Sequence, residues 1–149
     1  MSLAENIIEL CAMAGPAGFE QAVAARVREL LTPYMDEVKT DVLGNVIGVK
    51  RCGKENAKRL LFDAHIDEIG FTVTGHEEGF LRFSTLGGVD ARMLPASEIR
   101  ILTEPPIFGI IGTIPPHTQK SEESDKAINT EDLFIDIGMT QEEAKKAAP

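Results

Sequence analysis

The spacing of hydrophobic positions changes along the chain and predicts helices first and strands afterwards. In residues 3–13 apolar side chains recur three and four positions apart, which predicts a short amphipathic helix that ends before the glycine- and proline-rich residues 15–18. Residues 19–35 repeat this spacing, with Pro33 near the end, where a missing backbone donor is tolerated. We expect this second helix to bury one stripe, formed by Val23, Val27, Leu30 and Leu31. We expect its charged face to stay in water, at Glu20, Arg26, Arg28 and Glu29.

A hairpin and one short apolar run follow the two helices. Residues 36–41 alternate, Gly44-Asn45 marks a turn, and residues 46–49 are rich in β-branched side chains, a pattern typical of a β-hairpin. Residues 59–63 (Arg-Leu-Leu-Phe-Asp) form an apolar run bounded by charges, which predicts a buried strand. Two helices, a hairpin and a buried strand together predict an α/β fold, as part of a three-layer domain.

Beyond Ile69 the pattern becomes one of short strands separated by glycine and proline. Strands are expected within residues 71–74, 80–83, 98–102, 107–114 and 132–137, and the polar residues 115–129 are interpreted as a surface loop. Thr140, three residues before Glu143, predicts a capping box and a last helix from Gln141. Strands this short favour a small β-barrel or sandwich, so we predict one domain over residues 1–72 and a β-rich one over residues 73–149.

Composition and charge narrow the classes of partner. The chain has 149 residues, of which 43% are hydrophobic, and a net charge of −9, which disfavours binding to nucleic acid or to an anionic membrane. No apolar run approaches the ~20 residues of a transmembrane helix, and the N-terminus lacks a signal-peptide pattern. Cys11 and Cys52 belong to no paired-cysteine motif, so we expect two reduced thiols in a cytoplasmic protein.

One of the three histidines stands out as a candidate ligand. His76 falls in a predicted turn and His117 at the start of the polar loop, and both are interpreted as surface residues. His65 directly follows the predicted buried strand, and Asp67, two positions on, points to the same side of an extended segment. That carboxylate can fix the imidazole tautomer and raise the basicity of the nitrogen that faces a metal. By itself, His-x-Asp is a common pattern that fits a structural histidine satisfied by a neighbouring carboxylate better than it fits a metal ligand.

Six ordered segments resemble the metal-dependent aminopeptidases of metallopeptidase family forty-two. This is the glutamyl and tetrahedral aminopeptidase group, some members of which have been labelled endoglucanases. The most specific segment is residues 64–71, AHIDEIGF, close to the family signature A-H-x-D-E-I-G-F. The others are residues 15–20 (GPAGFE), 41–45 (DVLGN), 86–95 (LGGVDARMLP), 111–117 (IGTIPPH) and 132–138 (DLFIDIG). The resemblance covers nearly the whole chain.

The resemblance implies a function and assigns roles to two residues. It implies a catalytic α/β domain that carries a smaller inserted β-rich domain with subunit contacts, and a site of two divalent ions, zinc or cobalt. His65 would be a metal ligand and Asp67 its acidic catalytic partner. Homo-oligomers and peptide substrates follow from the same resemblance. The metals would activate a water for attack on the peptide bond.

The resemblance reaches only the N-terminal part of such an enzyme. Family members are more than twice as long, and their other ligands and their general base lie in the part without a counterpart here. Catalytic zinc usually takes three protein ligands, so we expect residues 1–149 alone to be inactive. Two alternatives stay open. The chain could be a non-catalytic β-rich interaction or oligomerisation module, or a carbohydrate-active enzyme, although Tyr34 is its one tyrosine and it has no tryptophan for stacking on sugars.

Overall fold

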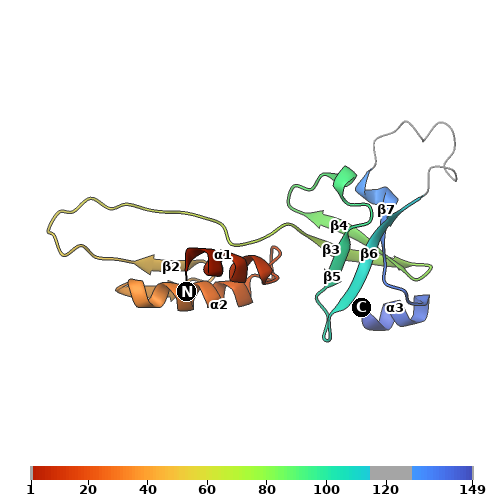
Figure 1. Ribbon diagram of the computed structural model, residues 1–149, viewed down its shortest axis with the longest axis horizontal. Helices are drawn as coiled ribbons and strands as arrows, with labels where there is room; N and C mark the ends of the chain where they lie inside the picture. Colours follow the sequence, from red (N-terminus) through yellow and green to blue (C-terminus); the bar gives the residue numbers. More distant parts are fainter. Residues whose placement is uncertain (1, 115–128, 149) are drawn as a thin grey trace. The chain divides into compact units, whose positions relative to one another are not determined.

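The computed structural model describes residues 2–114 and 129–148, and it divides into two compact units, residues 1–68 and residues 69–149 (Figure 1). The first unit contains helices α1 (Leu3–Ala12) and α2 (Gln21–Leu31), a 3₁₀ turn over Thr32–Tyr34, and strands β1 (Glu37–Thr40) and β2 (Val46–Val49). The second contains strands β3 (Gly70–Glu77), β4 (Phe80–Leu86), β5 (Glu98–Ile101), β6 (Ile107–Thr113) and β7 (Leu133–Asp136), and helix α3 (Gln141–Ala147). The predicted combination of helices and strands is therefore confirmed.

The two predicted helices form and are joined by a charged contact. Ser2 and Glu5 form a capping box that starts α1, and Val23 is buried at 5% exposure on α2. The Arg26 guanidinium reaches Glu9 with Nε–Oε1 at 2.7 Å and Nη2–Oε2 at 3.0 Å. This pair lowers the pKa of the Glu9 carboxyl below its ordinary value, through the hydrogen bond from Arg26 first. Arg26 thus binds α2 to α1, whereas the sequence predicted a solvated side chain.

The predicted hairpin also forms, and its turn is organised by one carboxylate. Strands β1 and β2 pair antiparallel, with Glu37 opposite Val49. The Asp41 carboxylate accepts hydrogen bonds from the backbone amides of Leu43 at 2.9 Å and Asn45 at 3.0 Å, and from the Asn45 side-chain amide at 2.9 Å. These donors, with the Asn45 side chain first, lower the pKa of Asp41. Asp41 is therefore a structural residue of this turn.

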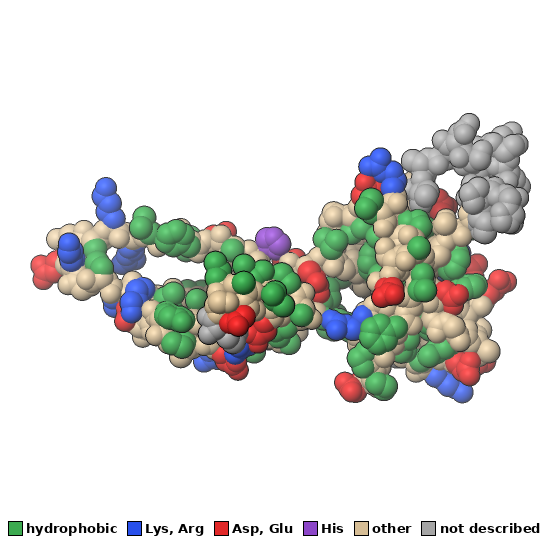
Figure 2. Space-filling model, viewed as in Figure 1, with side chains coloured by type: hydrophobic (Ala, Val, Ile, Leu, Met, Phe, Trp, Pro, Cys, Tyr) green, Lys and Arg blue, Asp and Glu red, His purple; other side chains and the backbone are tan. Residues whose placement is uncertain are grey.

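The predicted buried strand at residues 59–63 does not form. This segment pairs with no strand in the described parts of the chain, and Leu60, Leu61 and Phe62 are 82%, 91% and 91% exposed. Figure 2 shows hydrophobic side chains standing out along the extended segment between β2 and β3. An apolar run becomes a strand only where a neighbouring strand can take its backbone hydrogen bonds, and no described residue does so here. The expected burial is therefore wrong for this structure.

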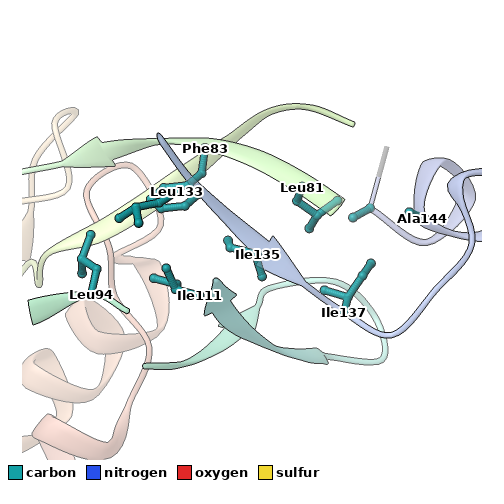
Figure 3. Packing of buried hydrophobic residues seen from close by; sticks show 9 residues of the cluster. Leu81, Phe83, Leu94, Ile111, Leu133, Ile135, Ile137 and Ala144 are labelled. Carbon is teal, nitrogen blue, oxygen red and sulfur yellow. The ribbon is translucent and has the colours of Figure 1, made fainter. Parts of the chain in front are cut away.

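The core of the second unit lies on one face of a curled five-stranded sheet. The strand order is β3-β4-β7-β6-β5, and each neighbouring pair is antiparallel. Ile135 on β7 stands opposite Leu81 on β4 and Ile111 on β6, and these three side chains are at most 1% exposed. Figure 3 shows that they point toward one another, together with Phe83, Leu94, Leu133, Ile137 and Ala144. The short-strand pattern therefore predicted these strands correctly.

Helix α3 closes one end of this core and changes the surroundings of His76. Thr140 and Glu143 form the predicted capping box. The Gln141 side-chain oxygen accepts a hydrogen bond from the Gly79 amide at 2.6 Å. His76 lies in β3, is half-buried, and has its Nε2 2.6 Å from the Ala148 carbonyl oxygen. The prediction that His76 is a solvated turn residue is therefore wrong, because α3 covers it.

The expectations for the polar loop and for transmembrane helices can be compared with the described residues only. The predicted polar loop at residues 115–129 and the surface role of His117 fall almost entirely outside the described residues. Within the parts that are described, no helix is both long and apolar enough to cross a membrane.

Candidate metal-binding site

The side chains of His65 and Asp67 lie together at the exposed end of the first unit. The His65 Nδ1 is 3.1 Å from the Asp67 Oδ1 and 3.0 Å from the Asp67 carbonyl oxygen. Because a carboxylate and a carbonyl can only accept, Nδ1 must carry the proton, which leaves Nε2 of the neutral ring with its lone pair. The imidazole is 85% exposed, so this lone pair is accessible. The ring is therefore not a buried histidine sealed in an apolar interior.

The backbone that carries this pair is fixed by the next residue. The Glu68 amide donates to the Gly15 carbonyl at 3.0 Å, and the Gly15 amide donates to the Glu68 Oε1 at 2.9 Å. Pro16 and Glu68 also form an isolated parallel bridge. We call these two bonds the Gly15–Glu68 clamp. They join two segments that are 53 residues apart in the sequence.

Gly15 connects the clamp to the second helix. It is buried, and a Cβ placed on it would lie 2.7 Å from Cγ2 of Val23, the buried residue of α2. The close approach of backbone to side chain explains why glycine stands at this position. Gly18, three residues on, has φ of +92° and turns the chain into α2. The GPAGFE segment is thus a turn that contacts both α2 and the His65 segment through its buried Gly15.

Sequence reasoning missed the role of Glu68. The sequence patterns assign no role to Glu68, whereas the structure shows its side chain accepting a hydrogen bond from the Gly15 amide. The signal that could have found it is its place in the AHIDEIGF signature, together with the GPAGFE segment at the other end of the contact. One sequence does not show that these two segments meet.

The donor set fits a single ligand position and does not fit a whole metal site. In the described ranges, no group of three or more His, Cys, Asp or Glu side chains lies close enough to hold an ion. His65 supplies one nitrogen, and Asp67 is held against the other nitrogen of the same ring. Since catalytic zinc usually takes three protein ligands, hydrolysis cannot be assigned to these residues alone.

The LGGVDARMLP segment contains a second well-formed charged pair. The Asp90 carboxylate accepts hydrogen bonds from the Arg92 amide at 3.0 Å, from Nε at 2.9 Å and from Nη2 at 2.6 Å. These bonds, the side-chain one first, lower the pKa of Asp90 to about 2. Asp90 caps the 3₁₀ turn over Ala91–Met93, which contains Arg92, so this pair orders the loop.

Comparison with known proteins gives one consistent family. The family model of M42 glutamyl aminopeptidase matches residues 44–148. The lysyl aminopeptidase of Pyrococcus furiosus is 33% identical over 133 residues, which is 87% of this chain and 38% of that protein. The chain therefore spans about two fifths of the length of such relatives.

Two solved structures share the fold. A TET aminopeptidase from the marine sediment archaeon Thaumarchaeota archaeon SCGC AB-539-E09 has a TM-score of 0.87 and 37% identity, over 96% of this chain and 40% of that one. The TET1 peptidase of Pyrococcus horikoshii, described as assembling into a tetrahedron or a large octahedral shell, has a TM-score of 0.75 and 33% identity, over 96% and 42%. With the family match covering more than half of its residues, including the AHIDEIGF segment, this chain belongs to the M42 glutamyl aminopeptidase family.

Proposed function

We propose that the chain is the N-terminal portion of a two-metal aminopeptidase that removes N-terminal residues from peptides. His65 would provide one metal ligand through Nε2, and Asp67 would be the catalytic-site carboxylate that holds the ring. The observation that carries this proposal is the contact of 3.1 Å between His65 Nδ1 and Asp67 Oδ1 on an exposed ring. A bound zinc or cobalt ion would polarise the peptide carbonyl and lower the pKa of a bound water.

The chain's own residues perform only a part of that task. They fix the imidazole tautomer, leave one nitrogen accessible, and hold the segment against α2 through the Gly15–Glu68 clamp. The described residues do not gather the further ligands that a catalytic ion needs. We therefore propose that residues 1–149 bind a divalent ion weakly and do not hydrolyse peptides by themselves.

Metal titration tests the role of His65. We expect calorimetric titration with Co²⁺ or Zn²⁺ to give binding in the wild-type chain and its loss in His65→Ala. His76→Gln is the matched control, because His76 is a half-buried residue of β3 with no proposed ligand role, so its replacement should leave the isotherm unchanged. Identical isotherms for the wild type and His65→Ala would remove the proposed ligand.

A peptidase assay tests the second half of the proposal. The wild-type chain, incubated with an amino-acid anilide with and without Co²⁺, should release no chromophore above the metal alone. Hydrolysis that is lost in His65→Ala would show that the chain completes a site by itself, and the proposed inactivity would then be wrong.

The division into two units supports a proposal for the domains. We propose that residues 1–72 are part of the catalytic domain and that residues 73–149 are an inserted β-barrel-like domain that carries contacts between copies of the chain. The second unit has its own core, and Leu60, Leu61 and Phe62 in the first are uncovered. Together with the assemblies named for the solved relatives, these surfaces support a homo-oligomer. A monodisperse monomer at high concentration by light scattering would contradict this.

A non-catalytic interaction module is the second candidate function. On the outer face of β6, Phe108 and Ile110 are 70% and 52% exposed, an apolar pair typical of a contact surface. This candidate predicts a stable oligomer that forms without metal and dissociates in Phe108→Ser. An oligomer unaffected by Phe108→Ser would reject this surface.

The physiological setting is proposed from charge and thiols. Because the net charge of −9 would repel the phosphates of nucleic acids and of anionic lipids, we propose peptides as substrates, without binding to nucleic acid or to a membrane. Cys11 and Cys52 are free and exposed, as expected for a reducing cytoplasm. Acid trapping with a thiol reagent should find both cysteines reduced in intact cells.

A further inference from the structure

We propose that Glu68 is a positioning residue for His65. It would act through the Gly15–Glu68 clamp, which holds the backbone of Asp67 so that the Asp67 carboxylate meets the imidazole. The functional purpose of orienting the ring rests on the proposed metal-binding role of His65. The positioning effect of the clamp on the ring does not depend on that role.

The need for such an anchor follows from the exposure of the preceding segment. Residues 50–65 are all exposed and contain no helix or strand. No packing therefore holds His65 from its N-terminal side, and the contact of its ring with Asp67 is local in sequence. A local contact of this kind orients the ring only if the backbone between the two residues is itself fixed.

The clamp supplies that fixed point through the first residue after Asp67. Glu68 bonds Gly15 with both its amide and its carboxylate, at 3.0 Å and 2.9 Å, and Gly15 packs against Val23 of α2. The chain of contacts therefore runs from the helix through Gly15 and Glu68 to Asp67. The carboxylate is the part of this chain that substitution can remove while the backbone stays intact.

The chemistry of the bond defines an informative set of variants. Glu68→Ala removes the acceptor, and Glu68→Asp keeps the charge but shortens the reach to the Gly15 amide. Glu68→Gln keeps an oxygen that can accept from an N–H, so it should rescue the contact. Glu20 is the matched control, because its Oε1 accepts from the Gly18 amide at 2.8 Å in the same turn without reaching the His65 segment.

The readout is the tautomer of the His65 ring, measured by ¹⁵N NMR on the metal-free full chain about two pH units above the ordinary imidazole pKa of ~6.5. The wild type, Glu68→Gln and Glu20→Ala should show mainly the Nδ1-protonated ring. In Glu68→Ala and Glu68→Asp, the ratio of Nδ1- to Nε2-protonated ring should fall roughly fivefold, the factor equivalent to one net hydrogen bond of about 1 kcal/mol. A purely structural carboxylate would leave this ratio unchanged.

The result that would overturn the inference is an unchanged tautomer ratio in both Glu68→Ala and Glu68→Asp, or an equal shift in Glu20→Ala. The amide spectrum of the second unit reports that each variant is folded there, and the α2 amides report the first unit. If Glu68→Ala disrupts α2, Glu68→Asp decides, because it retains the charge and most of the side chain.

A Co²⁺ titration of the same proteins separates this inference from the proposed function. A tautomer shift in Glu68→Ala, in a chain whose wild type binds no Co²⁺, supports the clamp and contradicts the metal role of His65. Co²⁺ binding that depends on His65 but is equal in the wild type, Glu68→Ala and Glu68→Asp supports the metal role and contradicts the positioning role of Glu68.

Discussion

Replacing Gly15 with alanine should loosen the support of the candidate site. The new Cβ would lie 2.7 Å from the Val23 Cγ2 and 3.6 Å from the Val23 Cβ. Since two carbon atoms prefer a separation of about 3.5–4.0 Å, the closer pair overlaps by roughly 1 Å. Val23 is only 5% exposed, so its side chain has little room to move away. The overlap must therefore be relieved by separating the turn from α2.

Two opposing terms set the size of the effect. Overpacking a buried contact typically costs about 1–3 kcal/mol. Gly15 does not need a positive φ, so alanine also restricts the unfolded chain and recovers about 0.4–1 kcal/mol. The packing term is larger, and we expect Gly15→Ala to destabilise the first unit by roughly 1–2 kcal/mol, a factor of about 5–30 in its opening equilibrium.

Native-state hydrogen exchange can measure this change within the first unit. The informative amides are those of Ala24 and Glu68, which donate to the Glu20 and Gly15 carbonyls at 2.8 Å and 3.0 Å. Both should exchange faster in Gly15→Ala. Gly88→Ala is the control, because nothing lies within 4 Å of its added Cβ and its φ is not positive, so its effect should stay within about 0.5 kcal/mol.

A double-mutant cycle tests the proposed cause. Val23→Ala removes the Cγ2 atom that the new Cβ meets, so the double variant should be less destabilised than the sum of the two single variants. The coupling free energy should be about 1 kcal/mol or more in this direction. Strict additivity, or a Gly15→Ala chain as well protected as Gly88→Ala, would refute the packing argument.

Two further predictions concern the second unit. Ile135→Ala should destabilise it by about 2–5 kcal/mol, since Ile135 is 1% exposed. Ile110→Ala, on the outer face of the sheet, should change its stability by less than about 1 kcal/mol. Hydrogen exchange of the β6 and β7 amides measures both changes, and equal losses would contradict the assigned faces. Arg92 lowers the pKa of Asp90 to about 2 from 3.8, so the pair's stabilisation is full above pH 3.8 and lost as the pH falls through about 2. A carboxyl ¹³C titration should show this midpoint and its rise in Arg92→Gln, and a wild-type midpoint near 3.8 would exclude the pairing.

The parts of the fold that sequence predicted are those whose evidence is local. The helices, the β1–β2 hairpin and the Thr140 capping box depend on spacings of a few residues, and all of them form. The strand expected at residues 59–63 does not form. An apolar run indicates that burial is favourable, but it does not identify the segment that would cover the run. His76 was mispredicted for the same reason, since its hydrogen-bond partner Ala148 lies 72 residues away.

The candidate site shows the same limit. The approach of Asp67 to His65 follows from the alternation of an extended segment, and the structure has the pair at 3.1 Å. The contact of Glu68 with Gly15 spans 53 residues and depends on a glycine with no room for a side chain. Neither the GPAGFE turn nor the AHIDEIGF signature indicates by itself that the two segments meet, so the contact is visible only in the three-dimensional structure.

The place of Glu68 in the chain has a mechanical consequence. Glu68 ends the first unit, and β3 of the second begins at Gly70, so torsion of the second unit can travel along the backbone toward the imidazole only through the clamped residue. Because two hydrogen bonds to Gly15 hold Glu68, we expect such torsion to be taken up beyond this residue and not at the imidazole. A change in the orientation of the second unit should therefore leave the 3.1 Å contact between His65 Nδ1 and Asp67 Oδ1 in place.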